Sequence, residues 1–272
     1  MVRSFLFVPG DRPERFDKAV ASGADAVCID LEDAVSALNK LAARRAALAY
    51  LSDKAPRATA VGIRLNALDR IDGIRDVAAL ADSCATPAFL LLPKVRSRDV
   101  IDQVREIFGD AAPPIWALME TPEAVAGIAV IAAGVRQGGG IVFGGADLSA
   151  ALGSDMSWDA LYFARAALIS GAAPVGCQLV DVPYLDVRDI AGMVDETRRI
   201  KAMGFTGRAC IHPDQVKPIN AAFSPTANEI EGARAVIDAY EKNGGRVLLV
   251  EGRLVEKPIL AAARRILARA KP

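Results

Sequence analysis

The chain alternates eight times between a short apolar, β-rich segment and a longer segment with helical periodicity. The apolar segments cover residues 3–8, 26–31, 59–65, 88–95, 115–120, 140–146, 175–181 and 207–212. Their apolarity is nearly continuous, which is typical of strands that are covered on both faces of a parallel sheet. Eight strand–helix units in succession predict an α/β fold, a (β/α)₈ TIM barrel that occupies residues 1–222.

Residues 223–272 do not continue this alternation. Ser224-Pro225-Thr226 predicts the start of a helix, Gly244-Gly245 ends it, and a short hairpin and a final amphipathic helix follow. We therefore predict a C-terminal helical extension. It would pack either on the helices of its own barrel or against a neighbouring subunit, and the sequence leaves both arrangements open.

The charge balance limits what the chain can bind. Lys and Arg together number 33, as do Asp and Glu, so the formal net charge is zero. A nucleic-acid or anionic-membrane surface needs a basic excess, so neither partner is expected. No apolar run approaches the ~18 residues of a membrane span, and the apolar start is too short for a signal peptide. We expect a cytoplasmic protein that binds a small molecule and meets any anionic ligand with local charges.

TIM-barrel enzymes bind their substrates at the carboxyl ends of the strands, and polar residues follow most of the predicted strands here. They are Asp30, Glu32 and Asp33 after the second strand, Arg64 after the third, Lys94 after the fourth, Glu120 after the fifth, Asp147 after the sixth, Asp181 after the seventh and His212 after the eighth. This set predicts a polar mouth at one end of the barrel.

Glu120 and Asp147 form the most informative pair in this set. Each ends an apolar segment, and because neighbouring parallel strands open into one mouth, the two carboxylates are expected to converge. Converging carboxylates can hold a hard cation such as Mg²⁺, which prefers oxygen ligands and keeps waters that a substrate can replace. The alternative is that both acids cap helices, which is common at strand-to-helix turns. Taken with the other polar residues, the pair favours a metal site.

Arg64 is expected to bind the substrate. Its planar guanidinium can donate two parallel hydrogen bonds to a carboxylate or a developing oxyanion. The alternative is an ion pair with Asp30 or Glu32, and an arginine held by one acid can still face a ligand. Gly145 and Ala146 are expected to present backbone N–H groups to an anionic ligand. A bulge at the barrel rim would explain the same glycine.

Two further polar residues receive lesser roles. Lys94 lies among carboxylates rather than in the apolar pocket that a Schiff-base amine needs, which favours metal-dependent chemistry. His212 is the only histidine of the chain and precedes a proline, so we expect it to be structural.

Several motifs resemble one known family along nearly the whole chain. They are Phe7-Val-Pro-Gly10, Asp30-Leu-Glu-Asp-Ala-Val35, Ile63-Arg-Leu-Asn66, Leu92-Pro-Lys94, Glu120-Thr-Pro-Glu-Ala-Val125, Phe143-Gly-Gly-Ala-Asp-Leu-Ser149 and Ile211-His-Pro213. In this order they resemble the citrate lyase β-subunit branch of the HpcH/HpaI aldolase family. The resemblance implies a Mg²⁺-binding TIM barrel, assembled as a homotrimer or hexamer. It also implies that a carbon–carbon bond is cleaved or formed between a 2-oxo acid and an acyl thioester.

The resemblance also assigns roles by motif. Glu120 and Asp147 match the metal ligands, and Arg64 matches the arginine that contacts the 2-oxo acid. Asp30, Glu32 and Asp33 match an acidic cluster behind the waters of the metal.

Three functions remain open from the sequence. The first is a free-standing lyase acting on a citramalyl-, malyl- or citryl-CoA thioester. The second is the β-subunit of a citrate lyase complex, with the thioester carried by an acyl carrier protein. The third is a non-catalytic ligand-binding homologue that kept the barrel. A CoA-independent pyruvate aldolase is a weaker alternative, because the histidine-centred motif of that branch is not found here.

Two expectations concern the rest of the substrate and the tail. Arg3, Arg12 and Arg15 are expected to bind the phosphates of CoA, unless they are ordinary solvated charges. In the related lyases, an aspartate in the tail reaches the barrel mouth of a neighbouring subunit and acts as acid/base. Glu256 takes its place here, one methylene longer. It would act in trans, or the site has drifted, or Glu256 only favours the dipole of the last helix.

Overall fold

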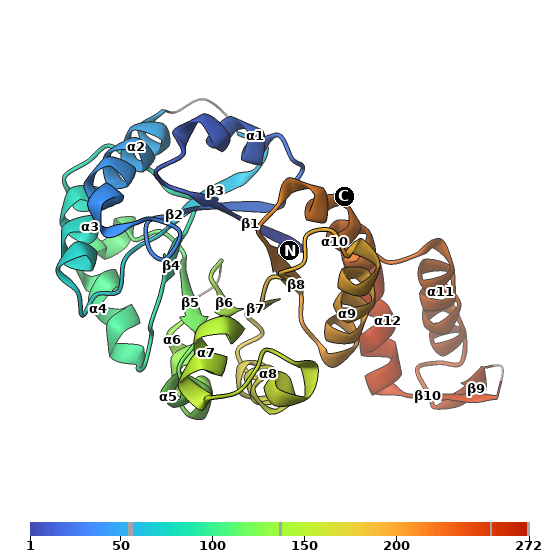
Figure 1. Ribbon diagram of the computed structural model, residues 1–272. Helices are drawn as coiled ribbons and strands as arrows, with labels where there is room; N and C mark the ends of the chain where they lie inside the picture. The colour runs from blue at the N-terminus through green and yellow to red at the C-terminus, as the bar shows by residue number, and fades with distance from the viewer. Residues whose placement is uncertain (54–56, 136–137, 251, 271–272) are drawn as a thin grey trace. The chain divides into compact units, whose positions relative to one another are not determined.

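The computed structural model describes residues 1–53, 57–135, 138–250 and 252–270. Within them, eight parallel strands close into a barrel in chain order, with helices around the outside (Figure 1). The strands are β1 (Ser4–Pro9), β2 (Ala26–Asp30), β3 (Ala60–Arg64), β4 (Leu90–Leu92), β5 (Ile115–Met119), β6 (Gly140–Phe143), β7 (Gln178–Asp181) and β8 (Gly207–Cys210). The predicted (β/α)₈ barrel is confirmed.

Each strand is followed by one or more helices. They are η1 (Pro13–Arg15) and α1 (Phe16–Val20), η2 (Ala37–Asn39) and α2 (Lys40–Ser52), α3 (Ile71–Ala81), α4 (Arg98–Phe108) with η3 (Gly109–Ala111), α5 (Pro122–Ala126) and α6 (Ile128–Gly134), α7 (Gly145–Leu152) and α8 (Trp158–Ala172), α9 (Ile190–Met203), and η4 (Pro213–Gln215) with α10 (Val216–Phe223). In α2, Ala43, Ala47 and Leu51 are buried at a spacing of four residues, so one helical stripe packs inward.

Aromatic side chains fill the barrel interior near the amino ends of the strands. The rings of Phe5 and Phe89 have centroids 5.2 Å apart, and Trp116 lies 5.4 Å from Phe5. Glycines on neighbouring strands make the room: a Cβ at Gly62 would lie 2.4 Å from the Phe89 ring, and one at Gly140 would lie 2.5 Å from the Trp116 ring. Aromatic rings therefore fill the barrel near the amino ends of the strands, and the polar residues lie toward the carboxyl ends.

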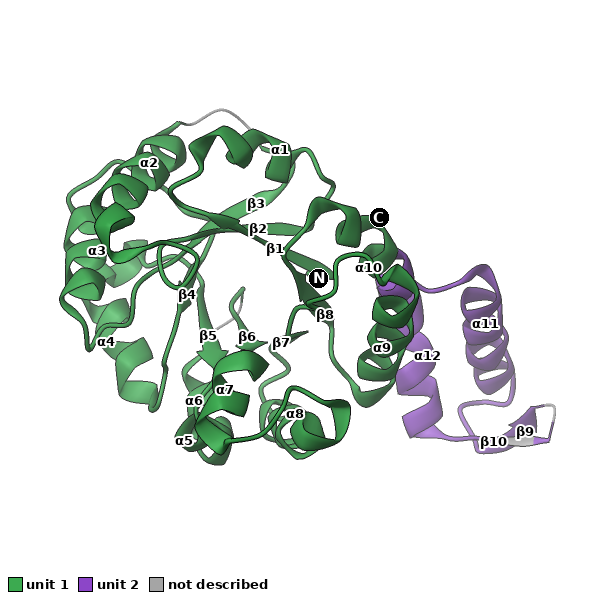
Figure 2. Cartoon of the chain, viewed as in Figure 1, with its two compact units in different colours: residues 1–220 green, residues 221–272 purple. Residues whose placement is uncertain are grey.

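The chain divides into two compact units, Met1–Asn220 and Ala221–Pro272, so the division falls within α10 (Figure 2). The second unit contains α11 (Ala227–Lys242), the antiparallel strands β9 (Leu248–Val250) and β10 (Arg253–Val255), and α12 (Lys257–Arg269). A capping box between Thr226 and Glu229 begins α11, as the sequence predicts.

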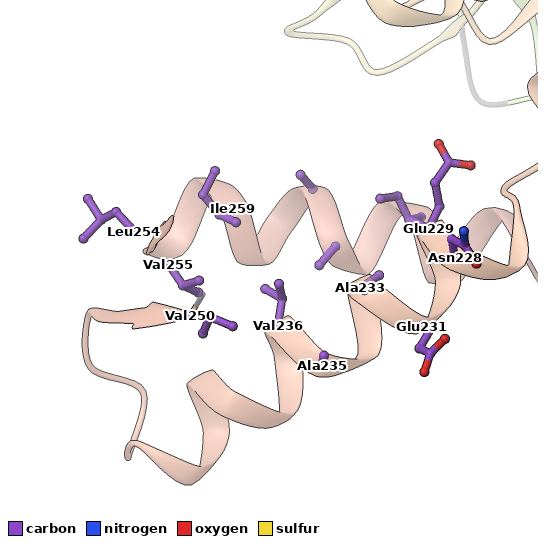
Figure 3. Close-up of a pocket in the computed structure, with 14 residues that line it drawn as sticks. Asn228, Glu229, Glu231, Ala233, Ala235, Val236, Val250, Leu254, Val255 and Ile259 are labelled. Carbon is purple, nitrogen blue, oxygen red and sulfur yellow. The ribbon is translucent and has the colours of Figure 1, made fainter. Parts of the chain in front are cut away.

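Tyr240, Val255 and Leu260 form a small core in the second unit. Beside it, α11, α12 and the hairpin surround a largely apolar cavity of about 640 Å³ (Figure 3). None of the helices in the described ranges is long and apolar enough to span a membrane.

Candidate functional site

The polar mouth follows from the alternation of side chains along the strands. Ala26 and Cys28 belong to the interior core, so Asp30, two residues further on, points to the same side. Trp116 and Leu118 place Glu120 in the same way. On each of these strands, two inward-facing apolar residues and then an acid therefore build a site at the carboxyl ends of the strands.

Arg64 is held by the acids of the neighbouring strand. Asp30 and Arg64 are direct partners in the β2–β3 register. The Arg64 Nε and Nη2 atoms each donate to Asp30 at 2.6 Å. Arg64 Nη1 lies 2.9 Å from Glu32 Oε2 and 3.6 Å from Asp33 Oδ2, and the guanidinium lies 5.2 Å from the ring centre of Phe7. The ion pair that the sequence offered as an alternative is present, and it fixes Arg64 at the mouth.

The loop after β2 is folded around Asp30. Its carboxylate accepts hydrogen bonds from the backbone N–H groups of Glu32 at 2.8 Å and Ala34 at 3.1 Å. The Lys40 ammonium donates to the carbonyl oxygens of Leu31 at 2.7 Å and Glu32 at 2.5 Å. Sequence reasoning missed Lys40, because nothing in the motif indicates that a lysine on the next helix reaches back to the loop.

Burial raises the pKa of two of the acids. Desolvation raises the pKa of Glu32 to about 8, although Arg64 lowers it. Within the described residues, Glu32 Oε2 accepts no hydrogen bond despite its short distance to Arg64. Desolvation likewise raises the pKa of Glu120, against the charge of Lys94 and its backbone hydrogen bond. Both carboxylates are therefore poorly solvated and would gain from a cation.

Glu120 and Asp147 share one cationic neighbour. Glu120 Oε1 accepts a hydrogen bond from the backbone N–H of Lys94 at 2.6 Å and lies 3.6 Å from Lys94 Nζ. The same ammonium forms an ion pair with Asp147. A Cβ at Gly144 would lie 2.5 Å from the Glu120 Cβ, so the position between β6 and α7 needs glycine to leave room for Glu120. The carboxylates of Glu120 and Asp147 therefore converge on the Lys94 ammonium.

Neither acid caps a helix. Thr121 caps α5, with its side chain accepting from the backbone N–H of Ala124 at 3.2 Å. Gly144 is the N-cap residue of α7, and Asp147 lies in the first turn of that helix. The capping alternative therefore does not account for the pair.

These side chains open into a cavity of about 360 Å³. It is lined by Phe7, Asp30, Asp33, Ala34, Arg64, Leu118, Glu120, Val142, Phe143, Gly144, Gly145, Ala146, Asp147, Val182, Pro183 and Ile211. Gly145 and Ala146, the expected backbone anion contacts, are among them. We call Asp30, Glu32, Asp33, Arg64, Lys94, Glu120 and Asp147 the mouth cluster.

A second cavity, of about 340 Å³, shares Phe7 and Ile211 with the first. Its cationic or titratable lining residues are Arg15, Lys18 and His212. The shared residues place it next to the mouth cavity, and its lining suits an anion.

The structure separates the residues expected to bind CoA. Arg3 precedes β1 and therefore lies at the amino ends of the strands, opposite the mouth. There it forms hydrogen bonds with both oxygens of Asp25 at 2.8 Å. The structure therefore does not bring Arg3 to the mouth. Arg12 is exposed after β1, on the side of the mouth, and Arg15 lines the second cavity.

Two other residues occupy helix starts. The His212 Nδ1 atom accepts from the backbone N–H of Asp214 at 3.2 Å and caps η4. Glu256 is the exposed N-cap residue of α12, without a side-chain capping hydrogen bond, and belongs to the second compact unit.

The sequence also did not predict a buried hydrogen-bond network around Asn66. Asp76 Oδ2 accepts from the backbone and side-chain nitrogens of Asn66 at 2.8 and 2.7 Å, and Asp76 Oδ1 accepts from Arg44 Nε at 2.5 Å. Asp76 lies on the buried stripe of α3 with Val77 and Leu80. An acid on an apolar helical stripe was the signal that could have revealed this support of the β3 end.

A second buried group of charges lies on the outer side of the barrel wall. Arg165 in α8 donates to Asp181 in β7 at 3.0 and 3.3 Å, and Arg208 in β8 donates to Glu196 in α9. Val180 and Ala209 point into the barrel, so their neighbours Asp181 and Arg208 point to the helices. We call Arg165, Asp181, Glu196 and Arg208 the wall cluster, and none of them lines the mouth cavity.

Comparisons with known proteins agree with this geometry. Residues 3–213 match the model of the HpcH/HpaI aldolase/citrate lyase family, and residues 161–272 match that of the C-C bond lyases of the TIM-barrel fold. A (3S)-malyl-CoA thioesterase of Cereibacter sphaeroides is 36% identical over 99% of this chain and 94% of its own. A citrate lyase subunit β-like protein of Mycobacterium tuberculosis is 35% identical over 98% and 94%.

The structural comparison gives the same result. The crystal structure of CitE from Mycobacterium tuberculosis in complex with magnesium, acetoacetate and coenzyme A matches with a TM-score of 0.83 and 33% identity. That match covers 99% of this chain and 98% of the other.

Proposed function

Because the chain belongs to the HpcH/HpaI aldolase/citrate lyase family of carbon–carbon lyases, we propose that it is a Mg²⁺-dependent lyase for a β-hydroxyacyl-CoA thioester. It cleaves the thioester to an acyl-CoA and a 2-oxo acid, or runs in reverse, with citramalyl-, malyl- or citryl-CoA as substrate. One observation carries the proposal: Glu120 and Asp147 both lie beside the Lys94 ammonium, and both line a cavity that Arg64 also lines.

The residues of the mouth suit a magnesium ion. Glu120 and Asp147 would hold it, because both offer carboxylate oxygens, which hard cations prefer. In the described part of the chain, no three His, Cys, Asp or Glu side chains gather as a metal group. Two protein ligands leave the other positions to water and substrate, as is usual for Mg²⁺. When bound, the ion would polarise the substrate's hydroxyl and carboxylate oxygens as a Lewis acid.

Arg64 is assigned to the oxygen that becomes the ketone. In cleavage, the β-hydroxyl loses its proton and its oxygen forms a carbonyl. The carbon–carbon bond breaks, and its electron pair passes to the thioester as an enolate. Asp30 and Glu32 hold the guanidinium in place, so the donors that they leave free need little reorganisation to meet the developing charge.

Glu256 is proposed to protonate the enolate carbon from a neighbouring subunit of a homotrimer or hexamer. Glu256→Gln should then be inactive and Glu256→Asp partly active. Mixing Glu256→Gln with Arg64→Ala subunits should restore activity, because mixed assemblies would contain some complete sites. No recovery after verified reassembly would exclude action in trans, and wild-type rates in Glu256→Gln alone would exclude Glu256 as the acid/base.

The second cavity is proposed to receive phosphates of CoA. Arg15 and Lys18 line it, and Arg12 lies nearby in sequence at the same end of the barrel. Arg12→Glu and Arg15→Glu should each raise KM for the CoA thioester more than KM for the free 2-oxo acid. Arg75→Glu on α3 makes the same charge change at an exposed site and serves as the control. Equal effects on both substrates would reject the assignment.

Thioester hydrolysis is a second candidate, because the (3S)-malyl-CoA thioesterase matches nearly the whole chain. A panel of CoA thioesters with Mg²⁺ separates the two reactions. Cleavage of the carbon–carbon bond releases a 2-oxo acid and keeps the thioester, whereas hydrolysis releases free CoA thiol. We expect a 2-oxo acid and acyl-CoA in equal amounts. Thiol as the first product would favour the thioesterase.

The same panel tests the remaining alternatives. A citrate lyase β-subunit should be inactive on CoA thioesters and active on the matching acyl-carrier-protein thioester. A non-catalytic homologue should bind but convert neither. The neutral charge supports an enzyme with no nucleic-acid or membrane partner, and we propose that it is cytoplasmic.

A further inference from the structure

Lys94 has an unusual backbone conformation. Its φ of 52° makes it the one residue other than glycine, among those described, with a positive φ. A left-handed backbone is strained for a residue with a side chain, and strained residues cluster at functional sites. In this conformation Lys94 makes two contacts: its backbone N–H donates to Glu120 Oε1 at 2.6 Å, and its ammonium forms an ion pair with Asp147.

The backbone and the side chain of Lys94 make separable contributions. The N–H group orients Glu120 and would do so whatever the side chain. The ammonium lies 3.6 Å from Glu120 Oε1 and contacts Asp147 Oδ2, so it stands next to one carboxylate oxygen of each acid. A metal ion held by Glu120 and Asp147 needs those oxygens, and like charges a few ångströms apart repel.

The ion pair is also accessible enough to be exchanged. The side chains of Lys94 and Asp147 are 29% and 39% exposed. Ion pairs in contact with water contribute little net stability, since solvent compensates both partners when they separate. A lysine on its flexible four-carbon chain can therefore leave at low cost, while the backbone hydrogen bond to Glu120 stays.

We propose that the Lys94 ammonium is a displaceable internal counter-ion that competes with the metal ion for Glu120 and Asp147. It keeps the two acids from repelling each other before the metal ion arrives, and it must move aside when the ion binds. The proposal rests on the proposed function, because it takes these two acids as the metal ligands. It makes Lys94 a residue that lowers the metal affinity of its own site.

The test is Mg²⁺ binding to the metal-free protein, measured by isothermal titration calorimetry without substrate. Lys94→Gly removes the ammonium and keeps both the N–H group and the positive φ, which glycine adopts without strain. We expect it to bind Mg²⁺ about fivefold more tightly, the size of one partly exposed ion pair. Lys94→Asn, which also tolerates this conformation, should behave alike. Unfolding temperatures confirm that each variant is folded.

Arg96→Ala is the matched control, because Arg96 is exposed and its loss changes the net charge equally. Its Mg²⁺ affinity should stay close to that of the wild type. If Lys94→Gly binds no more tightly than the wild type, or if Arg96→Ala tightens binding as much, the competition is disproved and the proposed function stands. If neither the wild type nor Lys94→Gly binds Mg²⁺, both the competition and the proposed metal site are wrong.

Discussion

The mouth cluster and the wall cluster contain the same types of residue in opposite settings. Both place arginine against carboxylates, and both include residues of the barrel strands, Arg64 in the mouth cluster and Asp181 and Arg208 in the wall cluster. In the wall cluster, Arg165, Asp181 and Arg208 are at most 1% exposed, and aromatic rings cover the guanidinium groups, with Trp158 4.8 Å from Arg165. In the mouth cluster, Arg64 is 9% exposed and lines a cavity.

The difference shows how a barrel separates stability from chemistry. The wall cluster points outward between strands and helices, and desolvation raises the pKa of Asp181 there, although Arg165 and Arg208 lower it. The mouth cluster points inward at the open end, where desolvation also raises the pKa values of Glu32 and Glu120. Burial and a raised pKa alone therefore do not identify a site; charges that also face a cavity do.

The largest effect is expected at Glu120. Glu120→Gln should lower kcat at least ~10³-fold, more than the loss of one transition-state donor, because it removes a ligand of the proposed metal. The free energy of unfolding should not fall, since the carboxylate is desolvated in the folded state. Steady-state rates and urea denaturation check both parts. If Glu120→Gln also lowers the free energy of unfolding, Glu120 has a structural role like that of the wall cluster.

Arg64→Lys should have the next largest effect. It keeps the charge and loses the planar fork that Asp30 holds at two points. We expect kcat/KM to fall by ~10²–10³, the cost of one transition-state donor. The control is Arg75→Lys on the outer surface, which should leave the rate unchanged. Near-normal turnover in Arg64→Lys would show that Arg64 serves only to neutralise Asp30.

Asp181→Asn should give the opposite pattern. It leaves Arg165 and Arg208 buried with one carboxylate fewer, and breaking such a group costs roughly 3–5 kcal/mol. The urea midpoint should fall at an unchanged m-value, while kcat of the folded enzyme stays near that of the wild type. A large loss of kcat without a loss of stability would contradict the separation of the two clusters.

The smallest effect is a pH dependence at Glu32. Its pKa of about 8 in the folded state is above the usual carboxyl value of 4.5, so the folded state binds the extra proton between these values. The stability of the metal-free protein should therefore decline as pH rises through this range. Glu32→Gln should reduce the slope, and Asp33→Asn, an exposed neighbour, should not. Equal slopes in the wild type and Glu32→Gln would contradict the raised pKa.

The sequence predicts the barrel well, because its information is local. Each strand is a continuous apolar run, and helix starts such as Thr121 with Pro122 are caps that can be read directly. The acids at the strand ends are predicted for the same reason: strand direction and period-two alternation place Asp30 and Glu120 at the mouth.

What the sequence could not give depends on contacts between distant segments. Asp25 fixes the position of Arg3, yet the two are far apart in the chain and lie at the end of the barrel that the motif did not indicate. The left-handed backbone of Lys94 likewise accompanies a contact with Glu120, which follows the next strand along the chain. Long-range pairing of this kind leaves no periodic pattern.

The most direct test of the metal-dependent mouth is the rate of 2-oxo acid release from a CoA thioester that the panel identifies as a substrate. It is measured in excess EDTA and again after Mg²⁺ is restored. The account predicts no release in EDTA, full recovery with Mg²⁺ in the wild type, and no recovery in Glu120→Gln. Full activity of the wild type in EDTA would contradict it.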